Sequence, residues 1–338
     1  MDGPAAPTPY DRDTLYPTPV TLYGLFNAGL AKPDVSPQPS ACGAPAPTRH
    51  VGIDSVERSR IGLRTTEFLS GGPMAHLNLE QSLQLDKGEL LLPCERFDAR
   101  ATVGLSDREW GRVDLGRIEQ AASALVQRAD PWRGNGAASP GWRTYMTPAA
   151  VGIRSSNTIT YATPAEPPLR ATLQLGLPRL DPGQSREKGG SIAWDRLPWL
   201  VGIGWHAWSD GSRVTPVVVV HDSGTLRMSG ALTLGRLGLV DYRNLFVGAS
   251  GYWMGKGDPQ RQEWRVGFDR HRVDGGGIGA WQSDDKLSLG WRYRFSRHTW
   301  VALGAAWIKP REQPSRTAFD LSLSYSFERD LRVPQWPR

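Results

Sequence analysis

The sequence predicts an all-β protein, an up-and-down antiparallel barrel of about sixteen strands. The main observation is a period of two: apolar and polar residues alternate over about ten residues at a time, with Gly, Pro and Asp between the runs. In the run 286–296, one face carries Leu287, Leu289, Trp291, Tyr293 and Phe295. The other face carries Lys286, Ser288, Gly290, Arg292, Arg294 and Ser296. Helical periodicity is nearly absent, so no helix-like cover for a sheet is expected.

The same alternation recurs in chain order, clearly over 59–67, 100–106, 169–177, 286–296 and 319–327 and weakly over 238–262. At roughly 21 residues per strand plus connection, the runs leave strands of ~10 residues, the length that crosses a bilayer at a tilt. Short connections are expected at 71–72, 107–111, 165–168, 196–199, 223–224 and 296–298, and long ones at 32–56, 120–154, 178–190 and 274–285. Short turns on one rim and long loops on the other are typical of outer-membrane barrels.

Length and composition exclude several classes of protein. The chain has 338 residues, of which 39% are hydrophobic and 22% charged, with a net charge of +6, so a disordered chain is excluded. The longest apolar stretches, 200–203 and 217–220, fall far short of the roughly 18 to 20 residues of a spanning helix. The first nine residues lack the pattern of a signal peptide, so either the protein is cytoplasmic or a signal peptide has been removed.

A soluble β-sandwich also alternates, so periodicity alone does not choose between a sandwich core and a lipid-facing barrel. Three features favour the barrel: Arg and Gly occupy the polar face in mid-strand, no helical cover is expected, and aromatic residues gather near strand ends. These aromatic residues are Tyr23, Phe68, Trp110, Tyr161, Trp253, Trp264, Trp291, Phe295 and Phe327. A soluble β-sandwich surface or adhesin protein remains the alternative, as does a barrel with no open pore.

Four segments in series carry a resemblance to a known family. They are Val20–Gly24 (VTLYG), Ser59–Glu67 (SRIGLRTTE), Arg100–Ser106 (RATVGLS) and Val113–Arg117 (VDLGR). In order and spacing they resemble the successive first strands of general diffusion porins of Gram-negative bacteria, especially the neisserial and Burkholderia-like type. The resemblance covers most of residues 18–327, and is strongest over the first 120 residues and over 286–327.

The resemblance implies a homotrimer of sixteen-stranded barrels in the outer membrane, with periplasmic turns, long outer loops and a third loop folded into the lumen. We therefore expect an N-terminal extension at 1–17, a barrel at 18–327 with the constriction loop at 120–154, and a tail at 328–338. The signal peptide would be absent from this chain. Outer-membrane lipid and lipopolysaccharide, small hydrophilic solutes and anions are the expected partners.

The chain departs from the family pattern at several positions. Asn27 stands where the family usually has an acid, and Thr160 and Ala162 stand where charges are frequent. Residues 328–338 follow Phe327, although the family typically ends on an aromatic residue. Arg117 falls on the outward positions of its strand, and only a bulge would turn it toward the pore.

Alternation assigns charged residues to the lumen wall. It places Ile61 and Leu63 outward and Arg60 and Arg64 inward. We predict a pore constriction formed by Arg60, Arg64, Arg100, Glu80, Asp114, Asp130 and Arg133. The further lumen-wall arginines are Arg112, Arg170, Arg227, Arg265, Arg292 and Arg294.

The inward positions of the strands hold more arginines than acids. The expected inward acids are Glu80, Asp86, Asp114, Asp269 and Asp320. Nine inward arginines outnumber these five acids, an excess of about four charges that predicts a preference for anions. Salt weakens this preference over a Debye length of about 8 Å.

The remaining observations concern the cysteines and the absence of catalytic motifs. Cys42 and Cys94 fall in the first and second long loops on the same rim, where one disulfide is expected, the alternative being two free thiols. No nucleophile elbow, His-Glu-x-x-His or metal-ligand spacing occurs, so neither an enzyme nor a metal or cofactor site is expected. The run 275–279 is glycine-rich but precedes no expected helix, and the arginines do not gather as a nucleic-acid surface requires.

Overall fold

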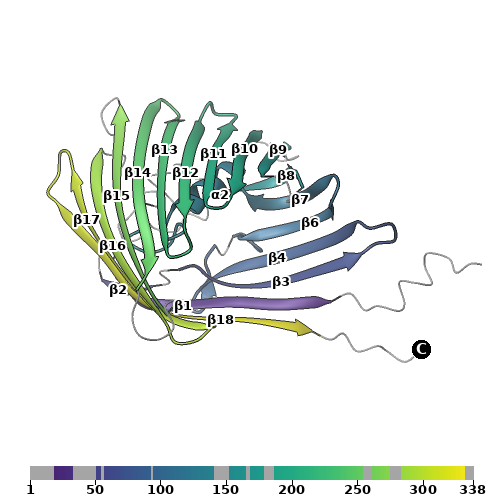
Figure 1. Ribbon diagram of the computed structural model, residues 1–338, viewed down its shortest axis with the longest axis horizontal. Coiled ribbons are helices and arrows are strands. Elements are labelled where there is room, and N and C mark those ends of the chain that lie inside the picture. Colours follow the sequence, from purple (N-terminus) through teal and green to yellow (C-terminus); the bar gives the residue numbers. More distant parts are fainter. Residues whose placement is uncertain are drawn as a thin grey trace, which may run out of the picture.

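The computed structural model describes residues 19–32, 51–54, 57–92, 94–140, 152–164, 168–178, 186–253, 261–274 and 283–331. Within these residues one antiparallel sheet contains eighteen strands (Figure 1). Two of them, β2 (Gly52–Asp54) and β5 (Glu89–Leu90), are very short. The other sixteen are β1 (Val20–Lys32), β3 (Ser59–Phe68), β4 (Met74–Gln84), β6 (Arg100–Asp107), β7 (Gly111–Glu119), β8 (Arg154–Ala162), β9 (Leu169–Gly176), β10 (Glu187–Arg196), β11 (Trp199–Trp208), β12 (Arg213–Asp222), β13 (Leu226–Leu237), β14 (Val240–Tyr252), β15 (Gln262–Asp274), β16 (Asp284–Arg294), β17 (Thr299–Pro310) and β18 (Arg316–Leu331).

The sheet closes into a barrel. β1 pairs with β3 on one side and with β18 on the other, where Val20 lies opposite Leu331 and Lys32 opposite Phe319. Closure satisfies the backbone groups that an open sheet would leave unpaired at its edges. The predicted sixteen-stranded barrel is confirmed, and the β-sandwich alternative is wrong, because a sandwich consists of two separate sheets.

β18 continues four residues past Phe327, where the barrel was expected to end, and Leu331 is its last residue. Within this extension Asp330 accepts a hydrogen bond of 2.7 Å from the Thr21 hydroxyl. The first residues of the expected tail therefore belong to the barrel wall. Residues 1–18 and 332–338 lie outside the described residues.

Side chains alternate between the two faces of the wall. On β16, Leu287 and Leu289 are exposed on the outer face, whereas Lys286 and Ser288 are buried on the inner face. Exposed leucine, valine and tryptophan side chains cover the outer face of the strands in this way. A continuous apolar outer face is the surface that a lipid bilayer requires.

The two ends of the barrel differ. We call the end where β7 stops and β8 begins the loop rim, and the opposite end, where residues 69–73 join β3 to β4, the turn rim. The short connections of the turn rim include 163–168, 197–198, 223–225 and 295–298. Two connections of the loop rim, 209–212 and 238–239, are also short, and the turn-rim connection 253–261 is longer than its neighbours.

One helix, α2 (Ala121–Ala129), lies inside the barrel and follows β7 directly (Figure 1). The expectation that no helix covers the sheet is therefore wrong, and the inward fold of the third loop is confirmed. Ala122, Leu125, Val126 and Ala129 have the spacing of one helical face, and all four are buried.

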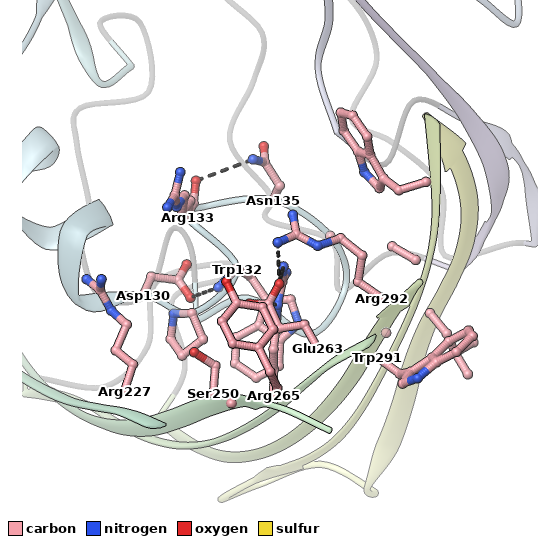
Figure 2. Close-up of a pocket in the computed structure, with 18 of the residues that line it drawn as sticks. Asp130, Trp132, Arg133, Asn135, Arg227, Ser250, Glu263, Arg265, Trp291 and Arg292 are labelled. Atoms are coloured by element: carbon pink, nitrogen blue, oxygen red, sulfur yellow. Dashed lines mark hydrogen bonds and ion pairs between the residues drawn. The ribbon is translucent and has the colours of Figure 1, made fainter. Parts of the chain in front are cut away.

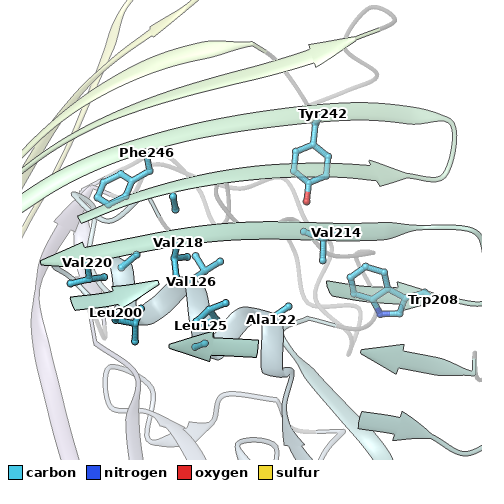
Figure 3. Packing of buried hydrophobic residues seen from close by; sticks show 13 residues of the cluster. Ala122, Leu125, Val126, Leu200, Trp208, Val214, Val218, Val220, Tyr242 and Phe246 are labelled. Carbon is cyan, nitrogen blue, oxygen red and sulfur yellow. The ribbon is translucent and has the colours of Figure 1, made fainter. Parts of the chain in front are cut away.

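This apolar helix face packs on the lumen side of β10 to β13 (Figure 3). The partners include Leu200, Val214, Val218 and Val220, which occupy inward positions. β12 is thus apolar on both faces: its outer face continues the exposed apolar surface of the barrel, and its inner face packs against α2. Each fully buried Leu or Val contributes about 1.5–3 kcal/mol.

Candidate pore and its charged lining

One wall of the lumen brings two arginines to a carboxylate. Arg60 of β3 lies 3.5 Å from Glu80 of β4, measured from Nε to Oε2. Arg100 of β6 lies directly opposite Glu80 in the strand register. Arg64 lies closer to the turn rim and forms an ion pair with Glu328 of β18.

Tyr23 points into the lumen beside these residues. Its hydroxyl donates to Asn78 Oδ1 at 3.0 Å and to Glu80 Oε2 at 3.1 Å, and the Arg64 guanidinium carbon lies 5.5 Å from its ring centroid. Tyr23 does lie near a strand end, but on the lumen face, so it is not one of the outward aromatic residues that favour a lipid-facing barrel. A Cβ at Gly62 would lie 2.3 Å from the Tyr23 ring, so the glycine makes room for the inward tyrosine.

Further inward arginines pair with carboxylates that lie deeper in the wall. Arg112 donates to Asp114 through Nε at 2.6 Å and through Nη2 at 2.8 Å. Arg170 lies 3.7 Å from Asp195, and Arg128 of α2 donates to the same carboxylate at 2.8 Å. In these pairs the arginine side chains are 38–46% exposed, whereas Asp114 is 7% and Asp195 19% exposed. The guanidinium groups thus project beyond the acids that partly neutralise them.

A cavity of about 280 Å³ lies between the wall and the third loop (Figure 2). Four of the predicted wall arginines line it, namely Arg227, Arg265, Arg292 and Arg294. Glu263 accepts hydrogen bonds from Arg265 at 3.0 and 3.2 Å and also from Arg292. Arg133 of the third loop lines the same cavity, together with Glu57, whose carboxyl pKa is raised by burial.

Asp130 braces the third loop and is buried. Its carboxylate accepts hydrogen bonds from the Ser139 hydroxyl at 2.6 Å and from the backbone N–H groups of Trp132 and Gly134 at 2.8 and 2.7 Å. Burial raises the pKa of Asp130, and the three donors oppose that shift. Its neighbour Arg133 has a φ of 54°, which belongs to the turn that follows the helix.

Two charged side chains of the wall hold the backbone of the third loop. The Lys286 ammonium donates to the carbonyl oxygens of Ala137 at 2.8 Å and Ser139 at 2.6 Å. Asp320 accepts a hydrogen bond of 2.6 Å from the Ala137 N–H. We call Lys286 and Asp320 the loop clamp. Both side chains are buried, so they act on the loop rather than on a solute.

Glycines of the wall let Trp132 lie close to the strands. A Cβ at Gly290 of β16 would lie 2.7 Å from the indole nitrogen of Trp132, and one at Gly267 of β15 would lie 3.0 Å from its ring. A Cβ at Gly248 of β14 would lie 3.1 Å from the neighbouring Pro131. Residues 131–132 therefore pack against Gly248, Gly267 and Gly290, where larger side chains would obstruct them. We call these three glycines the shelf.

The structure changes the expected balance of lumen acids. Asp86 lies in the exposed turn after β4 and is not part of the wall, while Asp269 is 1% exposed and Asp320 serves the loop clamp. Asp195, Asp222 and Glu263 occupy inward positions that the sequence analysis did not count. Each lies within 4 Å of an arginine, so most acids of the wall are paired.

Arg117 is directed away from the pore by local contacts. It donates to Glu95 at 2.8 Å, to the Asp98 carbonyl at 2.7 Å and to the Ser156 hydroxyl at 2.6 Å. The register between β7 and β8 shifts beside Arg117, because β8 has one extra residue there. Asn157, in this bulge, has a φ of 56°. The bulge lies on β8, and it gives Arg117 a partner in Ser156.

Cys94 is disulfide-bonded. Its expected partner Cys42 lies outside the described residues, as does the glycine run 275–279, so the pairing stays a prediction. Within the described ranges, no group of three or more His, Cys, Asp or Glu side chains could hold a metal ion. In the same residues, no helix is long and apolar enough to cross a membrane.

Comparison with known proteins gives concordant results. A family model described as Gram-negative porin matches residues 13–196. The chain is 33% identical over 157 residues to an outer membrane porin protein of Bordetella pertussis, and 31% identical over 150 residues to outer membrane porin protein 32 of Delftia acidovorans. These alignments cover 44% and 43% of this chain and span 40% of the length of each relative.

Solved structures share the fold over nearly the whole chain. An anion-selective porin from Comamonas acidovorans superposes with a TM-score of 0.73 at 21% identity, covering 92% of this chain and 100% of that one. OmpT of Vibrio cholerae lacking loop L8 has a TM-score of 0.67 at 14% identity and covers 91% and 99%. At these identities the likeness concerns the fold.

Proposed function

The chain belongs to the family of Gram-negative porins, and on this premise we propose that it forms a water-filled channel of the outer membrane with a preference for anions. Small hydrophilic solutes would pass by passive diffusion. The loop rim then faces the outside of the cell and the turn rim the periplasm. A homotrimer, as in the family, would leave each barrel with its own pore.

One observation carries the anion preference: in the pairs of Arg60, Arg112 and Arg170 the arginine is much more exposed to the lumen than its carboxylate, whereas in the pairs of Arg64, Arg227 and Arg265 the two exposures are nearly equal. Arg60 is 38% exposed and Glu80 17%, and Arg112 is 38% exposed against 7% for Asp114. At the pairs of Arg60, Arg112 and Arg170 a passing ion therefore meets guanidinium groups before it meets carboxylates. In a narrow lumen with low-dielectric walls, such an excess of one sign concentrates the opposite ion.

The proposal needs no covalent chemistry. The buried acids and the lysine of the loop clamp hold the third loop, and the exposed arginines supply the field. The name of the Comamonas neighbour, an anion-selective porin, agrees with this proposal. A barrel with no open pore remains the second candidate, and a conductance measurement separates the two.

The test is single-channel conductance and reversal potential of the refolded protein in a planar bilayer under a KCl gradient. We expect stepwise openings and a reversal potential of the sign for chloride preference. The triple variant R60S/R64S/R100S should enlarge the conductance and move the reversal potential toward that of a non-selective pore, because three exposed positive charges leave one wall.

The matched control is R196S, which removes an exposed arginine at an outward position of β10 near the turn rim. It should leave the reversal potential unchanged. A triple variant with the selectivity of the unmodified protein would refute the role of this wall, and a complete lack of conductance would refute the open pore.

A further inference from the structure

Four arginines gather on the outer face of the barrel near the loop rim, outside the pore. We call Arg243, Arg270, Arg272 and Arg311 the rim arginine cluster; all four line one cavity of about 280 Å³. Arg243 on β14 and Arg270 on β15 alternate with buried inward residues, so they occupy lipid-facing positions. β13, β14 and β15 lie side by side in the wall (Figure 1).

The strand register sets two of these charges against each other. Arg243 lies directly opposite Arg272, and both are on the outward face. Like charges at directly opposite positions of an antiparallel pair are unfavourable unless an anion lies between them. The sequence nevertheless places an arginine at both of these opposite positions. At the next pair of outward positions, Leu245 lies opposite Arg270.

The protein neutralises only part of the cluster. Asp285 of β16 is shared by Arg270 at 3.2 Å and Arg272 at 2.8 Å. Within the described residues, the guanidinium groups of Arg243 and Arg311 have neither a hydrogen-bond nor an ion-pair partner. Asp274 lines the cavity, and Asp285 lies beside it through its ion pairs with Arg270 and Arg272, so the four arginines and these two acids carry a net charge of +2.

Apolar side chains adjoin the cluster on the side toward the middle of the membrane. Leu232 of β13 and Leu245 of β14 lie opposite each other and are 45% and 44% exposed on the outer face. A site with two unpaired guanidinium groups beside exposed leucines fits an anionic group that carries an apolar chain. Arginine binds phosphate through paired N–H donors, which makes a phosphate the anion of choice.

We propose that the rim arginine cluster binds the phosphate of an outer-leaflet lipid headgroup, whose acyl chains lie along Leu232 and Leu245. This rests on the proposed function, because that function places the loop rim at the outer leaflet. The phosphate would lie between Arg243 and Arg272 and relieve their repulsion, and Arg311 would contact it from the loop side.

The test is native mass spectrometry of the full-length protein in detergent with bisphosphorylated lipid A, with the same lipid after removal of its phosphates, and with inorganic phosphate alone. We expect the phosphorylated lipid to be retained and the dephosphorylated lipid to be lost. The double variant R243Q/R311Q should weaken retention by roughly tenfold to thirtyfold, the loss expected for two arginines at an anionic lipid surface.

The matched control is R196Q, an exposed outward arginine near the opposite rim, which should bind as the unmodified protein does. Equal retention of both lipids, or equal retention by R243Q/R311Q and R196Q, would overturn the proposal. Binding of inorganic phosphate as tight as that of the lipid would overturn the lipid as its source. Conductance in a planar bilayer is read separately: a closed barrel that still binds the phosphorylated lipid refutes the channel and keeps this site.

Discussion

Replacing Lys286 with methionine tests whether the loop clamp holds the third loop in the lumen. The Lys286 ammonium makes two hydrogen bonds to loop carbonyl oxygens, at 2.8 and 2.6 Å, and methionine keeps most of the side-chain volume while removing both. The barrel itself should remain folded, because its strands are joined all round by backbone hydrogen bonds.

The magnitude follows from the two lost contacts. A hydrogen bond from a charged group contributes about 1.5–3 kcal/mol, so K286M should weaken the attachment of the loop by about 3–6 kcal/mol. That change raises the ratio of released to held loop by about 10²- to 10⁴-fold. Asp320, which accepts from the Ala137 N–H, retains its own contact and keeps the loop near the wall.

The assay is single-channel recording. K286M should show frequent transitions between conductance levels, where the unmodified protein shows a steady open level. The matched control is K309M, which removes the same charge from the outward face of the neighbouring strand β17. Current traces of K286M as steady as those of K309M would refute the reasoning that this lysine holds the loop.

Two further predictions address the shelf and the acids of the lumen. In G290A the new Cβ would lie 2.7 Å from Trp132, and this overpacking should cost about 1–3 kcal/mol, which lowers the free energy of unfolding or shifts the loop. Thermal unfolding in detergent measures the effect. The control is G230A, whose Cβ would have its nearest neighbour at 3.6 Å. Burial raises the pKa of Glu57, so acidification from neutral pH should neutralise this acid before ordinary carboxylates and increase the anion preference. E57Q should show a higher anion preference at neutral pH and a smaller change on acidification; an anion preference that decreases on acidification would contradict the assignment.

Alternation of apolar and polar residues in the sequence was sufficient to predict the barrel and to predict whether most side chains point inward or outward. The period of two places Leu287 and Leu289 on the lipid side and Arg292 on the lumen side, whatever the exact ends of the strand. The arginines of the wall could be named for the same reason. Tyr23 was misplaced because its strand is apolar on both faces near Leu25, where alternation carries little information.

The third loop shows what periodicity of strands cannot predict. The spacing of Ala122, Leu125, Val126 and Ala129 is helical and was available in the sequence, but it covers only two turns inside a long connection. Its packing partners lie on β10 to β13, about seventy to a hundred residues further along the chain. Local patterns do not report contacts over such distances.

The sequence by itself determined the closed β-barrel, its apolar outer face and its arginine-rich lumen, because each depends on a pattern that repeats within one strand. Only the tertiary structure decided which charges meet a solute. Lys286, Asp320 and Arg292 all point into the barrel. Lys286 and Asp320, however, bind the backbone of the third loop and are buried. The physical reason is that exposure of a lumen charge depends on where the third loop lies, and that position is set by contacts between segments far apart in the chain.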